Sequence, residues 1–451
     1  MVNFVNHNTM KIQLSDHFSY GRLLRFTWPT MMMMIVTSVY GVVDGVIVAN
    51  YVGTTAFASL NLIWPFVAIL GSVGFMFGTG GAALVAKTLG EGNATRARRL
   101  FSMLTYISIA LSVVLGAAGW LLARPVAVML GAEGEMVSLS TVYGRILFLM
   151  LPAYMLQIFF QSLLVVAEKP KMGMWVTVGA GLMNVALDML FVGVLDWGLP
   201  GAAWATCASQ LVGSGVPLAY FLFNRKNTLR LGRCNLDLKA LGQTCFNGLS
   251  EFVMQISLSL VSMIYMWQLL RQMGENGVAA YGIMMYFAFT FVAAFVGFGV
   301  GGTPVMSFHY GAGNHKEMRS LLTKSLQIVF TFGIVIEGLA QLLARPLCTF
   351  FVGYDGELLE LTVFAFRLYS IHFLYTGFNI YTSSLFTALN NGAISALISL
   401  SRTMIFEAGC VLILPLIFGI GSIWVAVAVA EGITCLLSFW MIHHFRPRYG
   451  Y

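Results

Sequence analysis

Long uncharged stretches separated by short polar segments run along the whole chain. Residues 104–122 and 146–167, for example, contain no Asp, Glu, Lys or Arg. A helix that crosses a bilayer needs about 20 such residues. The apolar pattern therefore predicts an all-α membrane protein with about twelve transmembrane helices. We place their cores at residues 26–49, 57–87, 99–122, 139–166, 173–195, 199–223, 246–270, 278–308, 320–342, 360–388, 394–417 and 422–443.

The two halves of the sequence resemble each other. Three motifs recur 221 positions later in the chain: 77–81 as 298–302, 90–93 as 311–314, and 121–125 as 342–346. Two related halves in a membrane protein are typical of secondary transporters, in which the substrate site lies between the halves. We therefore predict two six-helix lobes related by an internal repeat.

Composition excludes a soluble globule. The chain has 58% hydrophobic and 10% charged residues and a mean hydropathy of +0.82, whereas soluble domains carry about 25% charged residues. The six cysteines form no CxxC pair, so neither a zinc site nor a disulfide framework is expected. No catalytic dyad or phosphate-binding loop is present. We expect no cofactor and no enzymatic activity.

The basic residues are concentrated in alternate loops. Such loops follow residues 87, 167, 223, 308 and 443, whereas acidic residues such as Glu133 and Asp196 lie in the other set. Cytoplasmic loops of membrane proteins carry the excess of Lys and Arg, so this pattern predicts that both termini are cytoplasmic. The same pattern explains the net charge of +7 without a nucleic-acid partner.

The helices and loops divide the chain into five parts. They are a cytoplasmic tail (1–20), an N-lobe (21–223), a cytoplasmic connector (224–240), a C-lobe (241–445) and a second cytoplasmic tail (446–451). We expect a multi-pass protein of the inner (plasma) membrane that functions as a monomer.

Three polar residues of the first half lie within predicted membrane helices. They are Asp44, Asn184 and Asp188. A charge at the centre of a bilayer costs about 2.5–3.5 kcal/mol on insertion scales, so such residues indicate function. Asn184 and Asp188 are four positions apart and therefore share one helix face. Their oxygens are suited to a small hard cation or a proton. The alternative is a carboxyl group that only holds helices together.

The second half offers a separate set of ionisable residues at membrane depth. Glu251, Glu407 and Glu431 are secondary candidates, with Arg402 as a possible partner. For these carboxyl groups, a purely structural role is about as good an interpretation as a functional one. Glu337 is a weaker candidate because it is close to a helix end.

Methionine and aromatic residues are abundant in several predicted helices. Flexible thioethers and ring faces suit varied apolar and cationic ligands, although lipid contact and core packing explain many of them. As candidate residues of a substrate cavity we select Met34, Tyr40, Gln157, Tyr281, Met285 and Phe289.

At these positions the sequence resembles the multidrug and toxic compound extrusion (MATE) family, over nearly its whole length. The matching features, in chain order, are Pro29 with Asp44, Gly90-x-Gly92-Asn93, Asn184-x-x-x-Asp188, the segment 201–206, Ala388-Leu389-Asn390, and Arg402. The resemblance implies a two-lobed exporter driven by inward flow of Na⁺ or H⁺. It also implies a cation site formed by Asp44, Asn184, Asp188 and Thr206, and a further role for Glu251.

The expected function is a secondary active antiporter that exports lipophilic, often cationic drugs or toxic compounds in exchange for H⁺ or Na⁺. The partners would be small-molecule substrates and the lipid bilayer, and Na⁺ would be the one metal ion involved. The alternative is a lipid-linked precursor flippase of the same superfamily. A flippase would favour a strongly cationic central cavity, whereas this chain has few buried Arg or Lys.

Overall fold

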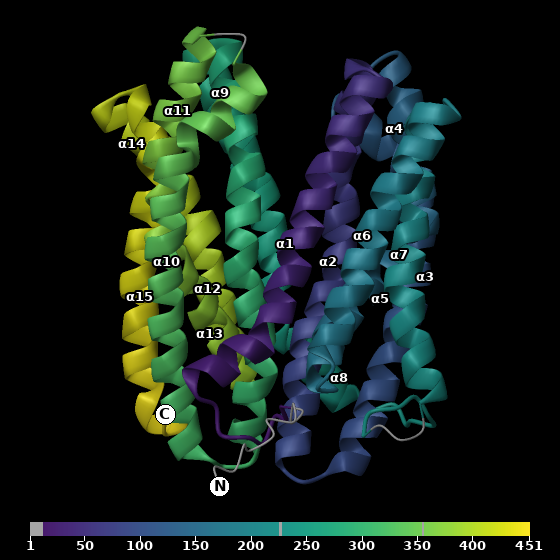
Figure 1. Cartoon of the computed structure of the whole chain (residues 1–451), viewed down its shortest axis with the longest axis vertical. Helices are drawn as coiled ribbons and strands as arrows, with labels where there is room; N and C mark the ends of the chain where they lie inside the picture. Colours follow the sequence, from purple (N-terminus) through teal and green to yellow (C-terminus); the bar gives the residue numbers. More distant parts are fainter. Residues whose placement is uncertain (1–11, 225–227, 354–355) are drawn as a thin grey trace, which may run out of the picture.

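The computed structural model describes residues 12–224, 228–353 and 356–451, and every regular element in these ranges is helical. The chain forms two lobes (Figure 1). The N-lobe contains α1 (Tyr20–Tyr51), α2 (Thr54–Gly90), α3 (Ala94–Met129), α4 (Glu135–Leu149), α5 (Leu151–Val166), α6 (Pro170–Asp188), the π-helix η1 (Met189–Val194) and α7 (Gly198–Phe223). The C-lobe contains α8 (Leu238–Asn247), α9 (Leu249–Gly311), α10 (His315–Val352), α11 (Gly356–Ser370), α12 (Phe373–Ala388), α13 (Gly392–Leu400), the π-helix η2 (Ser401–Glu407), α14 (Ala408–Phe418), the 3₁₀-helix η3 (Ile420–Val425) and α15 (Ala426–Tyr449).

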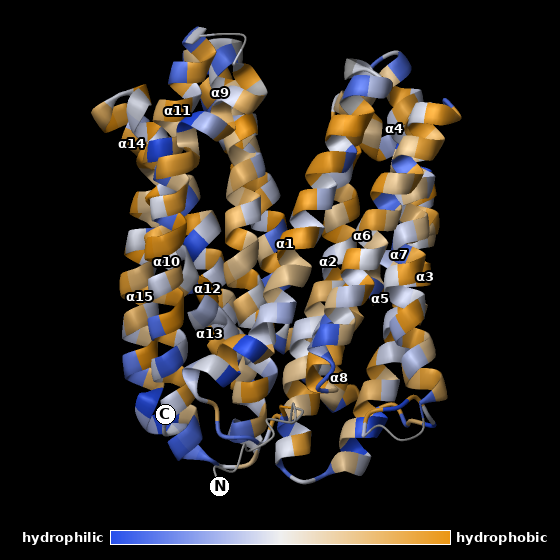
Figure 2. Ribbon diagram, in the orientation of Figure 1, coloured by the Kyte–Doolittle hydropathy of each residue, from blue (hydrophilic) through white to orange (hydrophobic). Residues whose placement is uncertain are grey.

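The predicted all-α membrane architecture is confirmed. Among the described residues, ten helices are long and apolar enough to cross a membrane, and two bent helix pairs bring the number to twelve. The longest element, α9, contains one of these spans and most of another that begins in α8, and Gly274, with a left-handed φ of 65°, interrupts the helix between them. Hydrophobic residues cover the middle of the helices, and hydrophilic residues gather toward their ends (Figure 2).

Two predicted helices are in fact bent pairs, at matching places in the two lobes. The helix predicted at 139–166 breaks between α4 and α5 with a bend of 54°, and the one predicted at 360–388 breaks between α11 and α12 with a bend of 46°. In the first pair, Pro152 lies at the start of α5. Proline has no N–H to continue the hydrogen bonds of the preceding helix, which explains the break there.

The two lobes meet where α2 crosses α9, and glycines allow this contact. A Cβ atom on Gly90 of α2 would overlap the carbonyl oxygen of Phe308 in α9. A Cβ atom on Gly311 of α9 would overlap the carbonyl oxygen of Lys87 in α2. The hydroxyl of Ser307 also donates to the carbonyl oxygen of Ala83, at 2.6 Å. Gly90 and Gly311 are equivalent positions of the repeat, so the contact is symmetric.

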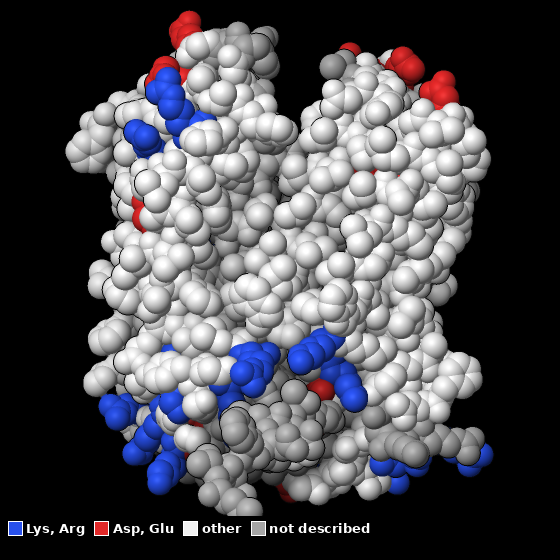
Figure 3. All heavy atoms as spheres, in the orientation of Figure 1, with Lys and Arg blue, Asp and Glu red and all other residues white. Residues whose placement is uncertain are grey.

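In a second symmetric pair of close contacts, a glycine of each lobe lies against the first helix of the other lobe. Gly80 of α2 lies against the backbone of Thr244 in α8, and Gly301 of α9 lies against Thr27 in α1. In Figure 1, α1 accordingly crosses from the foot of the C-lobe to the N-lobe. The lobes are therefore joined at the end that carries both termini, and a notch separates them at the opposite end (Figure 3).

Part of the predicted N-terminal tail packs onto both lobes. Leu14 and Phe18 are buried. The Leu14 N–H donates to Glu168 of the N-lobe at 3.0 Å, and the Phe18 N–H donates to Glu317 of the C-lobe at 2.9 Å. Residues 12–19 thus tie the lobes together at the terminal end. Residues 1–11 of the tail, and 225–227 of the predicted connector, lie outside the described residues.

Gly90→Ala and Gly311→Ala should each lower the stability of the protein by about 1–3 kcal/mol, because the added methyl group forces the α2 and α9 backbones apart. The matched control is Gly302→Ala in α9, the helix that contains Gly311, because a Cβ atom on Gly302 would meet no atom within 4 Å. The thermal unfolding midpoint of the purified protein in detergent measures the effect. Equal midpoints for all three variants would contradict the close crossing.

Candidate ion-coupling site

Asp44 and Asp188 come together between α1 and α6. These helices pack against each other, and the two carboxyl groups are close enough to interact electrostatically. Asp188 has no exposed surface and Asn184, one turn earlier, is 1% exposed. Both helices belong to the candidate membrane spans. The first and fifth predicted helices therefore supply one polar site.

This site is rich in acceptors and poor in donors. Among the described residues, both carboxyl oxygens of Asp188, one of Asp44, and both polar atoms of the Asn184 side chain have no hydrogen-bond partner. Buried polar groups are nearly always paired, and leaving them unpaired is costly. Two like charges in contact in a low-dielectric setting add further cost. A proton or a small cation between the carboxyl groups would remove both penalties.

The local backbone differs from a regular helix at this point. The π-helix η1 begins at Met189, directly after Asp188. Single π-turns inside α-helices occur frequently at functional sites, because the extra residue changes the directions of nearby side chains. Thr206 lies on α7, which packs against α6, and is 8% exposed.

Two candidate cavity residues lie beside the carboxyl pair. The Tyr40 hydroxyl faces the side chains of Gln157 and Thr37, and Asp44 is within electrostatic range of it. Met34, two turns before Tyr40 on α1, is 9% exposed. Sequence reasoning missed Tyr143 of α4, which is 1% exposed and within electrostatic range of both Asp44 and Asp188. Its position depends on the packing of α4, and no sequence signal distinguished it from other aromatic residues.

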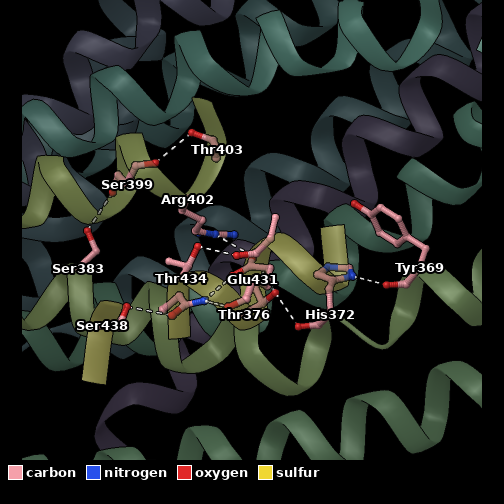
Figure 4. Close-up of polar contacts among 12 residues, drawn as sticks. Tyr369, His372, Thr376, Ser383, Ser399, Arg402, Thr403, Glu431, Thr434 and Ser438 are labelled. Atoms are coloured by element: carbon pink, nitrogen blue, oxygen red, sulfur yellow. Dashed lines mark hydrogen bonds and ion pairs between the residues drawn. The ribbon is translucent and has the colours of Figure 1, made fainter. Parts of the chain in front are cut away.

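The C-lobe contains a second polar cluster, centred on Glu431 of α15 (Figure 4). One of its carboxyl oxygens accepts hydrogen bonds from Arg402 Nε at 2.8 Å and from the Thr376 hydroxyl at 3.0 Å. The other accepts from the Asn379 amide at 2.6 Å. Ser438 in turn donates to the Asn379 carbonyl oxygen at 2.9 Å. Glu431 is therefore buried, paired and hydrogen-bonded, in contrast to the N-lobe carboxyl pair.

Two other candidate carboxyl groups border this cluster. Glu251 of α9 and Glu407 of η2 are each within electrostatic range of Arg402. The structure thus gathers three C-lobe carboxyl candidates, from three helical segments, around Arg402. Thr376 and Asn379 were missed, although two polar residues three positions apart on one face of a membrane helix are a usable signal.

Of the remaining candidates, Tyr281 is within electrostatic range of Glu407. Glu337 of α10 accepts a hydrogen bond from Gln341 at 2.7 Å. Tyr281 is 3% exposed and stacks on Tyr265 with a ring separation of 4.8 Å. The Tyr369 hydroxyl donates to the Met285 sulfur at 3.7 Å. Phe289 is half exposed (51%). Tyr281 therefore belongs to the packed interior of the C-lobe, and Phe289 to its surface.

The model of the MatE family matches residues 29–190 and again residues 251–411. The chain belongs to the MatE family. The second match starts 222 positions after the first, which agrees with the internal repeat and with the symmetric glycine contacts. It also confirms the family resemblance found in the sequence and places this MatE protein among multi-pass membrane proteins.

Individual relatives are distant in sequence but similar along the whole chain. Multidrug export protein MepA of Staphylococcus aureus (strain MSSA476) is 20% identical over 443 residues, which cover 95% of this chain and 94% of MepA. The solved outward-facing conformation of a multidrug resistance MATE family transporter of the MOP superfamily has a TM-score of 0.92 at 20% identity, covering 98% and 99% of the two chains. A solved MATE structure in the bent conformation has a TM-score of 0.87 at 20% identity, covering 96% and 97%.

The buried ion pair of this MatE protein should matter far more for stability than an exposed one of equal length. Arg402→Ala leaves the Glu431 carboxylate buried without its cation, so the free energy of unfolding should fall by about 3–5 kcal/mol. Arg345 and Glu360 also lie 2.8 Å apart, but both side chains are 62% exposed. Arg345→Ala should therefore change stability by at most about 1 kcal/mol.

Denaturant unfolding in detergent measures both variants. Adding Glu431→Gln to Arg402→Ala should recover part of the loss, because the uncompensated charge is then removed. Similar losses for Arg402→Ala and Arg345→Ala would contradict the importance of the buried pair.

Proposed function

We propose that this protein is a secondary active antiporter that exports lipophilic, often cationic small molecules in exchange for inward H⁺ or Na⁺. The observation that carries the proposal is the close approach of Asp44 and Asp188, next to the unpartnered amide of Asn184, within two membrane helices. These acceptors match the needs of a proton or a small hard cation. The multidrug export named for the MepA relatives supports the substrate class.

Coupling follows from the two states of the carboxyl pair. Without a cation, repulsion between Asp44 and Asp188 disfavours close packing of α1 against α6. Neutralisation by a bound H⁺ or Na⁺ removes the repulsion, so the two helices shift, and Thr206 on the adjacent α7 shifts with them. Because α1 also packs against the C-lobe helix α9, such a shift alters the space between the lobes. Substrate affinity and cation affinity thereby become linked.

The membrane potential gives this linkage its direction. One positive charge that moves inward gains about 2.3 kcal/mol per 100 mV. This energy corresponds to a substrate gradient of about 50-fold. The carboxyl pair therefore needs to bind the cation from one side and release it to the other, as alternating access between the two lobes allows.

The distribution of charge supports an inner-membrane protein with both termini in the cytoplasm. Lys and Arg are most numerous at the terminal end of the molecule, and acidic residues mark the opposite ends of the two lobes, with a smaller basic group next to the acidic tip of the C-lobe (Figure 3). With this orientation, the notch between the lobes opens to the outside. The high similarity to a transporter in an outward-facing conformation is consistent with this proposal.

The environment of Arg402 favours drug export over the flippase alternative. A flippase cavity needs free cationic groups for the phosphates of a lipid-linked precursor. Arg402 is instead neutralised by Glu431 and 14% exposed. Tyr40 and Gln157, beside the carboxyl pair, present a ring and an amide, which suit lipophilic cations.

Asp44→Asn and Asp188→Asn should each reduce cation-driven export to the background rate, because each removes one of the two charges that a cation neutralises. Glu337→Gln should be milder, since Glu337 lies outside the site. Transport is measured in proteoliposomes with the pH and Na⁺ gradients imposed separately. Export in a pH gradient without Na⁺ identifies H⁺ as the coupling ion, and a strict Na⁺ requirement identifies Na⁺. Gradient-driven export by both Asn variants at wild-type abundance would refute the site.

Expression in a drug-sensitive bacterium should raise tolerance to lipophilic cations such as ethidium, and Asp188→Asn should abolish the gain. We expect tolerance to lipophilic cations because aromatic rings lie near Asp44 and because Glu431 neutralises Arg402. The minimum inhibitory concentration is the readout. Unchanged tolerance together with complementation of a lipid-precursor flippase defect would establish the alternative instead.

A further inference from the structure

A groove of about 610 Å³ lies on the outer face of the molecule where α1, α6 and α10 meet. Its lining includes Leu24, Arg25 and Trp28 from α1, Lys171 and Trp175 from α6, and Phe332 from α10. Two of these helices belong to the N-lobe and one to the C-lobe. The groove therefore follows the seam between the lobes, near the end that carries both termini (Figure 1).

The aromatic residues open this groove to the membrane rather than to the interior. Trp28 is 54% exposed and Trp175 is 67% exposed, although both lie within candidate membrane spans. Tryptophan is enriched at the level of lipid headgroups, where its apolar ring and its polar N–H are both satisfied. The groove thus lies at the border between headgroups and acyl chains.

Cations and indole rings are arranged in the same way on two different helices. Arg25 precedes Trp28 by three positions, and Lys171 precedes Trp175 by four, so each pair shares one helix face. On both helices the cation is nearer the terminal end and the ring nearer the middle of the membrane. A ligand that fits this order has a negative head at the membrane surface and an apolar body below it.

The two cations of the groove are available for such a head. Within the described parts of the chain, neither Arg25 nor Lys171 has an ion pair or a hydrogen bond to another residue, and no acidic residue lines the groove. Neighbouring cations at the same end are differently placed: Arg22 donates to the His17 carbonyl oxygen and Arg319 to that of Gly450. Charge complementarity therefore favours an anion between Arg25 and Lys171.

We propose that this groove binds an anionic phospholipid of the adjacent leaflet. Its phosphate lies between Arg25 and Lys171, and its acyl chains lie along Trp28, Trp175 and Phe332. Because the lining comes from both lobes, the bound lipid stabilises the arrangement in which the lobes meet at the terminal end. The site is separate from the Asp44–Asp188 pair and independent of the coupling ion.

Native mass spectrometry of the purified full-length protein, titrated with dioleoyl phosphatidylglycerol or dioleoyl phosphatidylcholine, tests the proposal. The wild type should prefer the anionic lipid, and Arg25→Gln with Lys171→Gln should weaken its binding by roughly 10- to 30-fold. The charge-keeping double variant Arg25→Lys with Lys171→Arg should retain the preference. Trp28→Ala with Trp175→Ala should weaken binding of both lipids.

The matched control is Arg99→Gln with Lys316→Gln, which removes two exposed cations outside the groove. This control should bind phosphatidylglycerol like the wild type. The proposal is overturned if the groove variant (Arg25→Gln with Lys171→Gln) and this control lose affinity for phosphatidylglycerol equally, or if neither loses it. It is also overturned if millimolar inorganic phosphate displaces the lipid completely, since the site would then recognise a free anion. A monodisperse elution profile establishes that each variant is folded.

Discussion

The close crossing of α2 and α9 is the constraint on which the rest of the structure depends. Gly90 and Gly311 bring the two backbones into direct contact, each against a carbonyl oxygen of the opposite helix. In a membrane, helix association relies on such close packing, because lipid chains are as apolar as the side chains they replace. The contact joins equivalent positions of the two halves, so it lies on the axis that relates them. It fixes the lobes at the terminal end and leaves the opposite end free to separate.

The two lobes satisfy their buried polar groups in different ways. In the C-lobe, Glu431 is held by Arg402, Thr376 and Asn379, and each of its carboxyl oxygens is bonded. Such a network is stable as it is and expensive to break. In the N-lobe, Asp188 and Asn184 have polar atoms without partners. A site that is incomplete without a cation responds to that cation, whereas a completed network holds helices in place. This difference favours the N-lobe as the responsive half.

The sequence was sufficient to predict the membrane helices and the repeat, and it singled out Asp44, Asn184 and Asp188, which the structure brings together. Apolar runs report membrane spans directly, and Asn184 and Asp188 share a face because they are four residues apart. The pairing of Arg402 with Glu431 was left open, because the two residues lie on different helices and their approach depends on tertiary packing. The bends after α4 and α11 were missed for a related reason. The angle of each bend depends on packing, which the apolar pattern does not report, although Pro152 at the first bend and Ser370 and His372 at the second interrupt that pattern.

The repeat also explains why the C-lobe lacks a copy of the carboxyl pair. Glu407 follows Asp188 by 219 positions, close to the displacement of the repeat, but a π-helical segment follows Asp188 whereas one ends at Glu407. The position equivalent to Asp44 is Tyr265, 221 residues later, and Tyr265 is within electrostatic range of Glu407. One carboxyl group is therefore present near the equivalent position in both lobes, but a phenol replaces the second carboxyl group in the C-lobe. A neutral phenol creates no like-charge repulsion for a cation to relieve. Two carboxyl groups therefore meet in the N-lobe site, whereas a carboxyl group and a phenol lie at the corresponding place in the C-lobe.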